Sequence, residues 1–126
     1  MINKLKFYLS LIIARCAYIG IRLLNKSSGT SFVGMLVLKI CPNFLKYCSK
    51  YIKKNIITIT GTNGKSTTSG LIAHILETAH QKVVHNLKGA NMLTGVANVF
   101  ALSIAPLKRY DYAVIESDEA YLTKLY

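Results

Sequence analysis

Acidic side chains are absent from the first 54 residues of this 126-residue chain, although that segment holds ten lysines and arginines. Residues 55–126 carry six basic and five acidic side chains, so nearly all of the net charge of +11 belongs to the N-terminal segment. Such a segment favours a polyanionic partner or forms a solvated, lysine-rich surface, and the sequence leaves both open. No common nucleic-acid-binding motif is present, so we expect no nucleic-acid partner.

Cysteine and proline are scarce as well. The three cysteines, Cys16, Cys41 and Cys48, are odd in number and include no CxxC spacing, so neither a disulfide framework nor a compact metal motif is indicated. We expect reduced thiols in a cytoplasmic protein. With only two prolines and 52% hydrophobic residues, the composition excludes an intrinsically disordered chain.

Long uninterrupted hydrophobic runs are missing too. The most apolar segment, Leu5–Leu24, is split by Arg15, and the charge-free stretch before that arginine is much shorter than the roughly 20 residues of a membrane span. No small-x-small cleavage site follows, so the segment does not fit a signal peptide. The pattern instead predicts one helix over residues 1–26, with a basic stripe formed by Lys4, Arg15, Arg22 and Lys26.

This basic helix has two interpretations. Either it docks on its own domain, or it lies on the surface of an anionic membrane. We therefore expect a cytoplasmic protein, with peripheral attachment to the inner face of the membrane as the alternative.

The rest of the chain predicts alternating strands and helices. A turn-rich break over residues 25–34 and a short apolar stretch precede a helix over residues 43–54. We then expect strand 55–60, helix 66–80, strand 82–85, helix 92–104, strand 112–116 and a helix from residue 117. This order predicts an α/β fold: a P-loop-type parallel sheet with flanking helices, preceded by an N-terminal helical segment. Ligands of such sheets bind at the carboxyl ends of the strands.

The helix predicted over residues 66–80 opens directly after a glycine loop. Its apolar side chains fall on one face, formed by Leu71, Ile72, Ile75, Leu76 and Ala79. The loop reads Gly-Thr-Asn-Gly-Lys-Ser over residues 61–66. Glycines let backbone N–H groups approach an anion closely, and the start of a helix adds its dipole.

These residues indicate a phosphate cradle. Lys65 is placed to reach the β- and γ-phosphates, and the Ser66 hydroxyl to bind Mg²⁺. The loop is shorter than the common GxxxxGK[ST] pattern, because Ile59 stands where its first glycine belongs. A plain polar turn before a helix is the alternative.

A phosphate-binding loop also needs an acid on a neighbouring strand to hold Mg²⁺. Glu116, at the end of strand 112–116, is the first candidate, with an exposed strand-end carboxylate as the alternative. Asp118 and Glu119 fit the first turn of the following helix. For His85, at the end of strand 82–85, we favour a structural role.

The loop GTNGKS resembles the ATP-binding loop of the Mur ligases and folylpolyglutamate synthetases, which form amide bonds through acyl phosphates. Two further stretches, Val83–Phe100 and Tyr110–Leu122, narrow the resemblance to the MurT-type subunits of bacterial lipid II isoglutaminyl synthases. The short basic helical start, in place of a UDP-binding domain, agrees with these subunits. The resemblance implies a basic helical segment over residues 1–54 and a partial Mur-ligase-type ATP-binding domain over residues 55–126.

The same resemblance implies an activity. A subunit of this type uses ATP and Mg²⁺ to phosphorylate the α-carboxylate of D-glutamate in the stem peptide of lipid II. Ammonia from a GatD-type glutamine amidotransferase partner then attacks the acyl phosphate. The residues carried over for ATP are Gly61, Thr62, Asn63, Gly64, Lys65, Ser66 and Thr67.

Three further assignments follow from the resemblance. Ser66 and Glu116 would serve Mg²⁺. Asn91 matches an asparagine beside the γ-phosphate and the acceptor, and is the candidate catalytic residue. The family also implies a four-cysteine zinc site, whose ligands are absent from this chain.

Length is the departure from the family, since such subunits are several times longer. We therefore expect a fragment that is marginally stable and inactive alone. The alternatives are a piece of another Mur ligase or of a folylpolyglutamate synthetase, and a non-catalytic nucleotide-binding fragment.

Overall fold

The computed structural model describes residues 2–23, 29–86 and 92–119. Five helices and three strands lie within these ranges. In chain order they are α1 (Ile2–Leu23), α2 (Gly29–Ile40), α3 (Phe44–Ser49), β1 (Ile52–Ile59), α4 (Lys65–Thr78), β2 (Val83–His85), α5 (Leu93–Ser103) and β3 (Tyr110–Glu116).

The three strands form one parallel sheet in the order β1-β3-β2, with β3 in the middle. Ile59 of β1 pairs with Glu116, and His85 of β2 pairs with Val114. The carboxyl ends of all three strands therefore meet at one edge of the sheet. The predicted α/β fold, a parallel sheet with flanking helices and an N-terminal helix, is confirmed.

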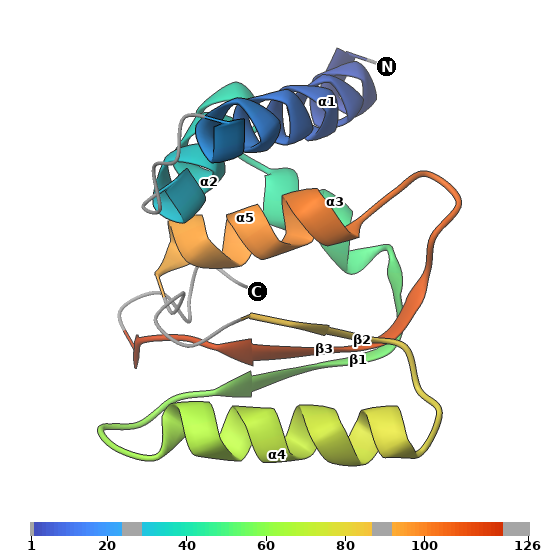
Figure 1. The fold of residues 1–126 in the computed structure, drawn as a ribbon. Helices are drawn as coiled ribbons and strands as arrows, with labels where there is room; N and C mark the ends of the chain where they lie inside the picture. Colours follow the sequence, from blue (N-terminus) through green and yellow to red (C-terminus); the bar gives the residue numbers. More distant parts are fainter. Residues whose placement is uncertain (1, 24–28, 87–91, 120–126) are drawn as a thin grey trace.

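Helices cover both faces of the sheet (Figure 1). The α4 helix lies against one face, while α5 and the short α3 lie over the other. The α1 and α2 helices form a further layer outside α5. Two-sided cover is what a parallel sheet requires, because its strands have no face suited to water.

The main hydrophobic core lies on the α5 side of the sheet. Its buried side chains come from all four helices of that side and from β2 and β3, and the largest fully buried ones include Phe44, Ile104 and Ile115. Ile52 and Ile56 of β1 are partly buried against them. Phe7 of α1 contributes an aromatic cluster with Phe44, Tyr47 and Tyr51, at ring-centroid distances between 5.3 and 5.8 Å. The N-terminal helices are thus part of the same core as the sheet.

The predicted break over residues 25–34 is wrong in its second half, because α2 begins at Gly29. Within that predicted break, Gly34 is expected to be a turn residue. In the structure a Cβ atom added at Gly34 would lie 1.7 Å from the carbonyl oxygen of Thr94 in α5. Glycine is needed here for the close approach of two helix backbones rather than for a turn.

The helix predicted over residues 43–54 is too long. The α3 helix ends at Ser49, and β1 already begins at Ile52, which pairs with Tyr110 across an irregularity in register. Parallel pairing with β3 takes over from the helix here, since Ile52 pairs with Tyr110 and Asn55 with Tyr112. As a result β1 crosses position 54, where the sequence suggested a division between two segments.

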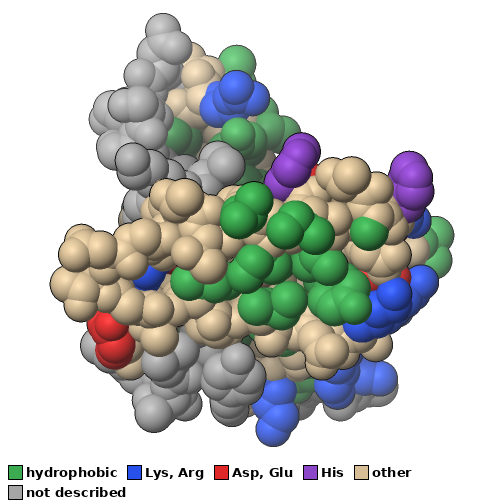
Figure 2. All heavy atoms as spheres, turned by 90° about the horizontal axis from the view of Figure 1, so that it is seen from below, with side chains coloured by type: hydrophobic (Ala, Val, Ile, Leu, Met, Phe, Trp, Pro, Cys, Tyr) green, Lys and Arg blue, Asp and Glu red, His purple; other side chains and the backbone are tan. Residues whose placement is uncertain are grey.

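The apolar face predicted for α4 is only partly correct. Ser69 and Ala73 are the buried residues of this helix, whereas Leu71 and Ile75 are 58% and 57% exposed. Figure 2, which views the molecule from the α4 side, shows hydrophobic side chains gathered in a patch on this surface. The docked face is rotated around the helix axis, because small residues let the helix lie close to the sheet.

Gly34 yields a stability prediction. Gly34→Ala should lower the free energy of unfolding by about 1–3 kcal/mol, since the added methyl group forces α2 away from α5. Gly70→Ala is the matched control: it lies inside α4 with nothing within 4 Å of an added Cβ. The control should raise stability by about 0.5–1 kcal/mol through helix propensity. Urea unfolding of both variants measures the difference, and equal effects would contradict the close-packing role.

Candidate functional site

The glycine loop, residues 61–64, joins the carboxyl end of β1 to the start of α4 (Figure 1). Gly61 has φ of 142° and Gly64 has φ of 78°, both in the region that side chains disfavour. A Cβ atom added at either position would meet nothing within 4 Å. The backbone conformation, and not a lack of space, therefore requires glycine at both positions.

Gly64 is also the N-cap of α4, and its carbonyl accepts the first helical hydrogen bond from the Thr68 amide at 2.9 Å. The first-turn N–H groups of a helix have no partner within the helix, and the macrodipole makes this end positive. No acidic residue occupies the first turn of α4. The end of the helix that adjoins the loop is thus suited to an anion.

Lys65 folds back over the loop. Its Nζ atom donates a hydrogen bond to the Gly61 carbonyl at 2.6 Å and lies 3.8 Å from a carboxylate oxygen of Asp118. The side chain is 16% exposed, so the ammonium group is largely enclosed. Both contacts hold a positive charge against the loop backbone.

Ser66 and Glu116 meet beneath this loop. The Ser66 hydroxyl donates a hydrogen bond of 2.7 Å to Oε2 of Glu116, and Glu116 is only 4% exposed. The two residues are 50 positions apart in the sequence, and they come together because β1 and β3 pair side by side. A hydroxyl and a carboxylate are the hard oxygen ligands that Mg²⁺ prefers.

Asn86 positions the end of β3. Its side-chain oxygen accepts a hydrogen bond from the Glu116 amide at 2.7 Å, and its Nδ2 donates to the Glu116 carbonyl at 2.8 Å. Asn86 is fully buried directly after β2. Sequence reasoning did not single out this residue. Its position just after a predicted strand was the available signal, since the strand ends of a parallel sheet converge.

On the other side, the Ser117 amide donates to the Ile59 carbonyl at 3.0 Å. The main chain around Glu116 is therefore tied to both neighbouring strands. A buried carboxylate held in this way has little freedom to move, which favours a defined binding geometry over a mobile surface acid.

Two acids that the sequence assigned to a helix start lie at the loop. Asp118 is the partner of Lys65 described above. The pKa of Glu119 is lowered, chiefly by a hydrogen bond with its own backbone and further by the Thr60 side chain and by Lys65. These two carboxylates follow β3 directly, and no local sequence pattern predicts that they lie near the loop.

The remaining predicted residues lie farther from the contacts of Lys65, Ser66 and Glu116. Thr62, Asn63 and Thr67 are exposed around the loop and the first turn of α4. His85 lies within 3.3 Å of the Ser69 hydroxyl, on the inner side of α4. Asn91, the candidate catalytic residue, lies outside the described residues.

The groups present fit a nucleotide phosphate with Mg²⁺. The loop provides the positive-φ glycines, the helix end and a lysine, while Ser66 and Glu116 provide paired oxygen ligands. A zinc site does not fit. Within residues 2–23, 29–86 and 92–119, no group of three or more histidine, cysteine or acidic side chains is arranged to hold a metal.

Relatives of known function share this region. The chain is 35% identical over 97 residues to the lipid II isoglutaminyl synthase (glutamine-hydrolyzing) subunit MurT of Staphylococcus aureus strain COL, covering 77% of this chain and 22% of that protein. It is 32% identical over 122 residues to the MurT subunit of Streptococcus pneumoniae strain R6, covering 97% of this chain and 26% of that protein.

A UDP-N-acetylmuramoylalanine–D-glutamate ligase of Bacteroides fragilis is 32% identical over 82 residues, covering 65% of this chain and 17% of that ligase. This chain spans about a quarter of the length of the MurT relatives. The Mur ligase middle domain family matches residues 59–125, which include the glycine loop, Ser66 and Glu116. The chain therefore belongs to the Mur ligase family.

Proposed function

We propose that this chain is the ATP-binding part of a lipid II isoglutaminyl synthase subunit. The observation that carries the proposal is the hydrogen bond of 2.7 Å between Ser66 and the buried Glu116, directly below the glycine loop. The two MurT subunits support the choice of this enzyme, because they match more of the chain than the D-glutamate ligase does.

Each part of the site has a role in this proposal. The loop amides of residues 61–64 and the start of α4 bind the phosphates of ATP, and Thr67 lies in the same first turn. Lys65 exchanges its contact with the Gly61 carbonyl for the β- and γ-phosphates. Ser66 and Glu116 ligate Mg²⁺, with Asn86 holding Glu116 in position.

The chemistry explains why so much positive potential is needed. The γ-phosphoryl group of ATP would pass to the α-carboxylate of D-glutamate in the stem peptide, and ADP would leave. The carboxylate and the γ-phosphate, both anions, must approach each other before this transfer, and Lys65 together with the first-turn amides of α4 lowers their repulsion. The amide forms when ammonia attacks the acyl phosphate and phosphate leaves.

Further partners belong to the same proposal. A GatD-type glutamine amidotransferase supplies the ammonia, and lipid II at the membrane surface is the acceptor. Asn91, which matches the asparagine that Mur-type loops place beside the γ-phosphate and the acceptor, is the proposed catalytic residue. The protein works in the cytoplasm, where ATP is present, and zinc is bound by residues outside this chain.

The reaction itself is tested with the full-length protein, its amidotransferase partner, ATP and glutamine. Mass spectrometry should find lipid II in which the α-carboxylate of D-glutamate has become an amide. Transfer of D-glutamate to UDP-N-acetylmuramoylalanine is the competing activity. Detecting that product instead would place the chain with the D-glutamate ligases.

Lys65→Ala should weaken ATP binding by about 10- to 100-fold, because a charged hydrogen-bond donor to the phosphates is lost. Isothermal titration calorimetry of the full-length protein at fixed Mg²⁺ measures the affinity. Lys82→Ala is the matched control, since Lys82 is an exposed lysine near the opposite end of the sheet. Equal ATP affinity in the Lys65 variant and the wild type would refute the phosphate-cradle assignment.

Glu116→Gln should preserve the fold, because the amide can still accept the Ser66 hydrogen bond. The Mg²⁺ concentration for half-maximal ATP binding should rise by about tenfold or more, since a charged ligand becomes neutral. Glu77→Gln, at an exposed acid of α4, is the control. A lower melting temperature with an unchanged Mg²⁺ requirement would make Glu116 a structural residue only.

A further inference from the structure

The α1 helix is apolar on two opposite faces. Its inner face packs into the core through Phe7, Leu11 and Ala14. Its outer face carries a second line of hydrophobic side chains. Successive members of this line are three, four or seven residues apart, which keeps them on one side of the helix. These side chains, here called the outer stripe, are Leu5 (71% exposed), Leu9 (48%), Ile12 (61%), Ile19 (58%) and Leu23 (81%).

The outer stripe runs along the whole helix and points away from the rest of the described structure. Figure 1 shows α1 in the outermost layer, which it shares with α2, on the side of α5 away from the sheet. The exposed Cys16 fills the gap between Ile12 and Ile19 on the same face. Single exposed leucines are ordinary, but a continuous apolar line of this length indicates a surface that meets an apolar phase.

Charge indicates what kind of surface it meets. Residues 1–54 hold ten basic and no acidic side chains. Lys4 and Arg22 lie on one flank of the stripe by helical position, and Lys6 lies on the other. Arg15, which the sequence grouped with them, instead donates to the Ile104 carbonyl at 2.7 Å and anchors α1 to the end of α5. The helix therefore joins an exposed apolar face to cationic flanks.

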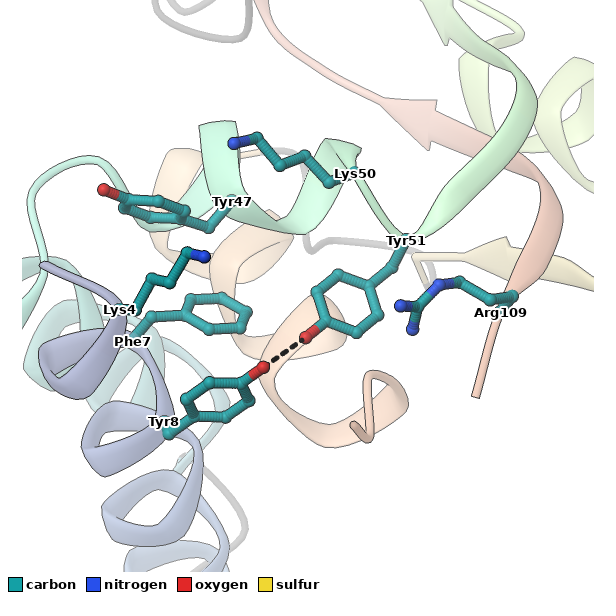
Figure 3. Close-up of a pocket in the computed structure, with 7 residues that line it drawn as sticks. All are labelled: Lys4, Phe7, Tyr8, Tyr47, Lys50, Tyr51 and Arg109. Atoms are coloured by element: carbon teal, nitrogen blue, oxygen red, sulfur yellow. Dashed lines mark hydrogen bonds between the residues drawn. The ribbon is translucent and has the colours of Figure 1, made fainter. Parts of the chain in front are cut away.

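A cationic pocket lies beside the N-terminal part of this helix (Figure 3). Its volume is about 250 Å³, and its lining contains three cations and no acid: Lys4, Phe7, Tyr8, Tyr47, Lys50, Tyr51 and Arg109. The Arg109 guanidinium lies 4.3 Å from the centre of the Tyr51 ring, and Lys50 lies 5.5 Å from that of Tyr47. The aromatic rings thus hold the cations at the walls of the pocket.

The Tyr51 hydroxyl does not offset these charges. Burial, with a hydrogen bond to Tyr8, raises the pKa of Tyr51 to about 12, so the phenol is neutral at physiological pH. Tyr51 and Arg109 precede β1 and β3, so the pocket lies at the amino ends of the strands. The glycine loop lies at their carboxyl ends, which makes the pocket a site separate from the proposed ATP site.

We propose that α1 docks this protein on an anionic lipid bilayer. The outer stripe enters the interface between headgroups and acyl chains, and the cationic pocket accepts the phosphate of a lipid headgroup. The helix lies in the plane of the membrane; none of the helices in the described part of the chain is long and apolar enough to span it. Apolar burial and attraction to anionic lipid act together in such helices.

Docking would bring the proposed ligase to a lipid-linked substrate, and in that respect it extends the proposed function. The docking proposal depends on residues other than those of the ATP site, however. It is tested by measuring lipid binding in the absence of ATP. Loss of amidation with intact vesicle binding would count against the proposed function alone. Intact amidation of a water-soluble acceptor without vesicle binding would count against docking alone.

Vesicle flotation of the full-length protein tests the outer stripe. The protein should bind phosphatidylcholine vesicles that contain phosphatidylglycerol, and bind pure phosphatidylcholine vesicles more weakly. Ile12→Gln with Ile19→Gln should weaken binding by about tenfold or more. Leu71→Gln with Ile75→Gln is the matched control, because these two side chains are about as exposed and belong to α4, which lies on the opposite side of the molecule from α1 (Figure 1). An equal loss in the control would overturn the assignment to α1.

A second pair of variants tests the pocket. Lys4→Gln with Arg109→Gln should remove most of the preference for phosphatidylglycerol. Lys53→Gln with Lys82→Gln removes the same charge from exposed positions outside the pocket and should keep that preference. Glycerol 3-phosphate and inorganic phosphate serve as soluble competitors. Equal losses in both pairs, or tight binding of free phosphate without lipid, would overturn the headgroup site.

Cys16 supplies a direct reporter of the stripe. It is exposed, whereas Cys41 and Cys48 are buried and their thiol pKa values are raised by burial. A polarity-sensitive thiol fluorophore on Cys16, measured against a Cys16→Ser background, should shift to the blue with anionic vesicles. A Cys16 that resists labelling in the lipid-free full-length protein would show that protein covers the stripe and would overturn the proposal.

Discussion

The candidate site depends on the parallel pairing of β3 with both of its neighbours. This pairing places Glu116 level with Ile59 at the end of β1, which is where the glycine loop begins. Backbone and side-chain hydrogen bonds from Asn86 and Ser117 then fix the main chain at that point. Because Glu116 is buried and held in this way, the first turn of α4 meets a carboxylate in a defined position. A slip of one residue in β3 would turn Glu116 to the other face of the sheet, and the Ser66 contact would be lost.

The N-terminal helices have a structural role that is separate from this site. They complete the core on the α5 side, and the contact of α2 with α5 depends on the missing side chain of Gly34. Only one face of α1 is needed for that packing. Its outer face is not needed for the core and carries exposed apolar side chains. For this reason the helix is hydrophobic on nearly all sides, although it lies at the surface.

The two ends of the sheet differ in chemistry. At the carboxyl ends, Lys65 is balanced by nearby acids, so the loop combines one positive charge with oxygen ligands for a metal ion. At the amino ends, aromatic rings and cations surround a pocket without any acid. This separation lets a nucleotide and an anionic surface be bound at opposite ends of one small domain without competing for the same residues.

Local sequence was sufficient for the alternation of strands and helices, for the glycine loop and for Glu116 as the acid at the end of the third strand. These features depend on side-chain periodicity and on residue types within a few positions of one another. Tertiary structure alone decided where α3 stops, which face of α4 is buried, that Gly34 is a contact and not a turn, and that Asn86 holds Glu116. Each of these depends on competition between local preference and a partner far away in the chain. Tertiary structure also decided which side of α1 remains exposed. A helix with two apolar faces has no local sequence signal that tells which face the core will cover.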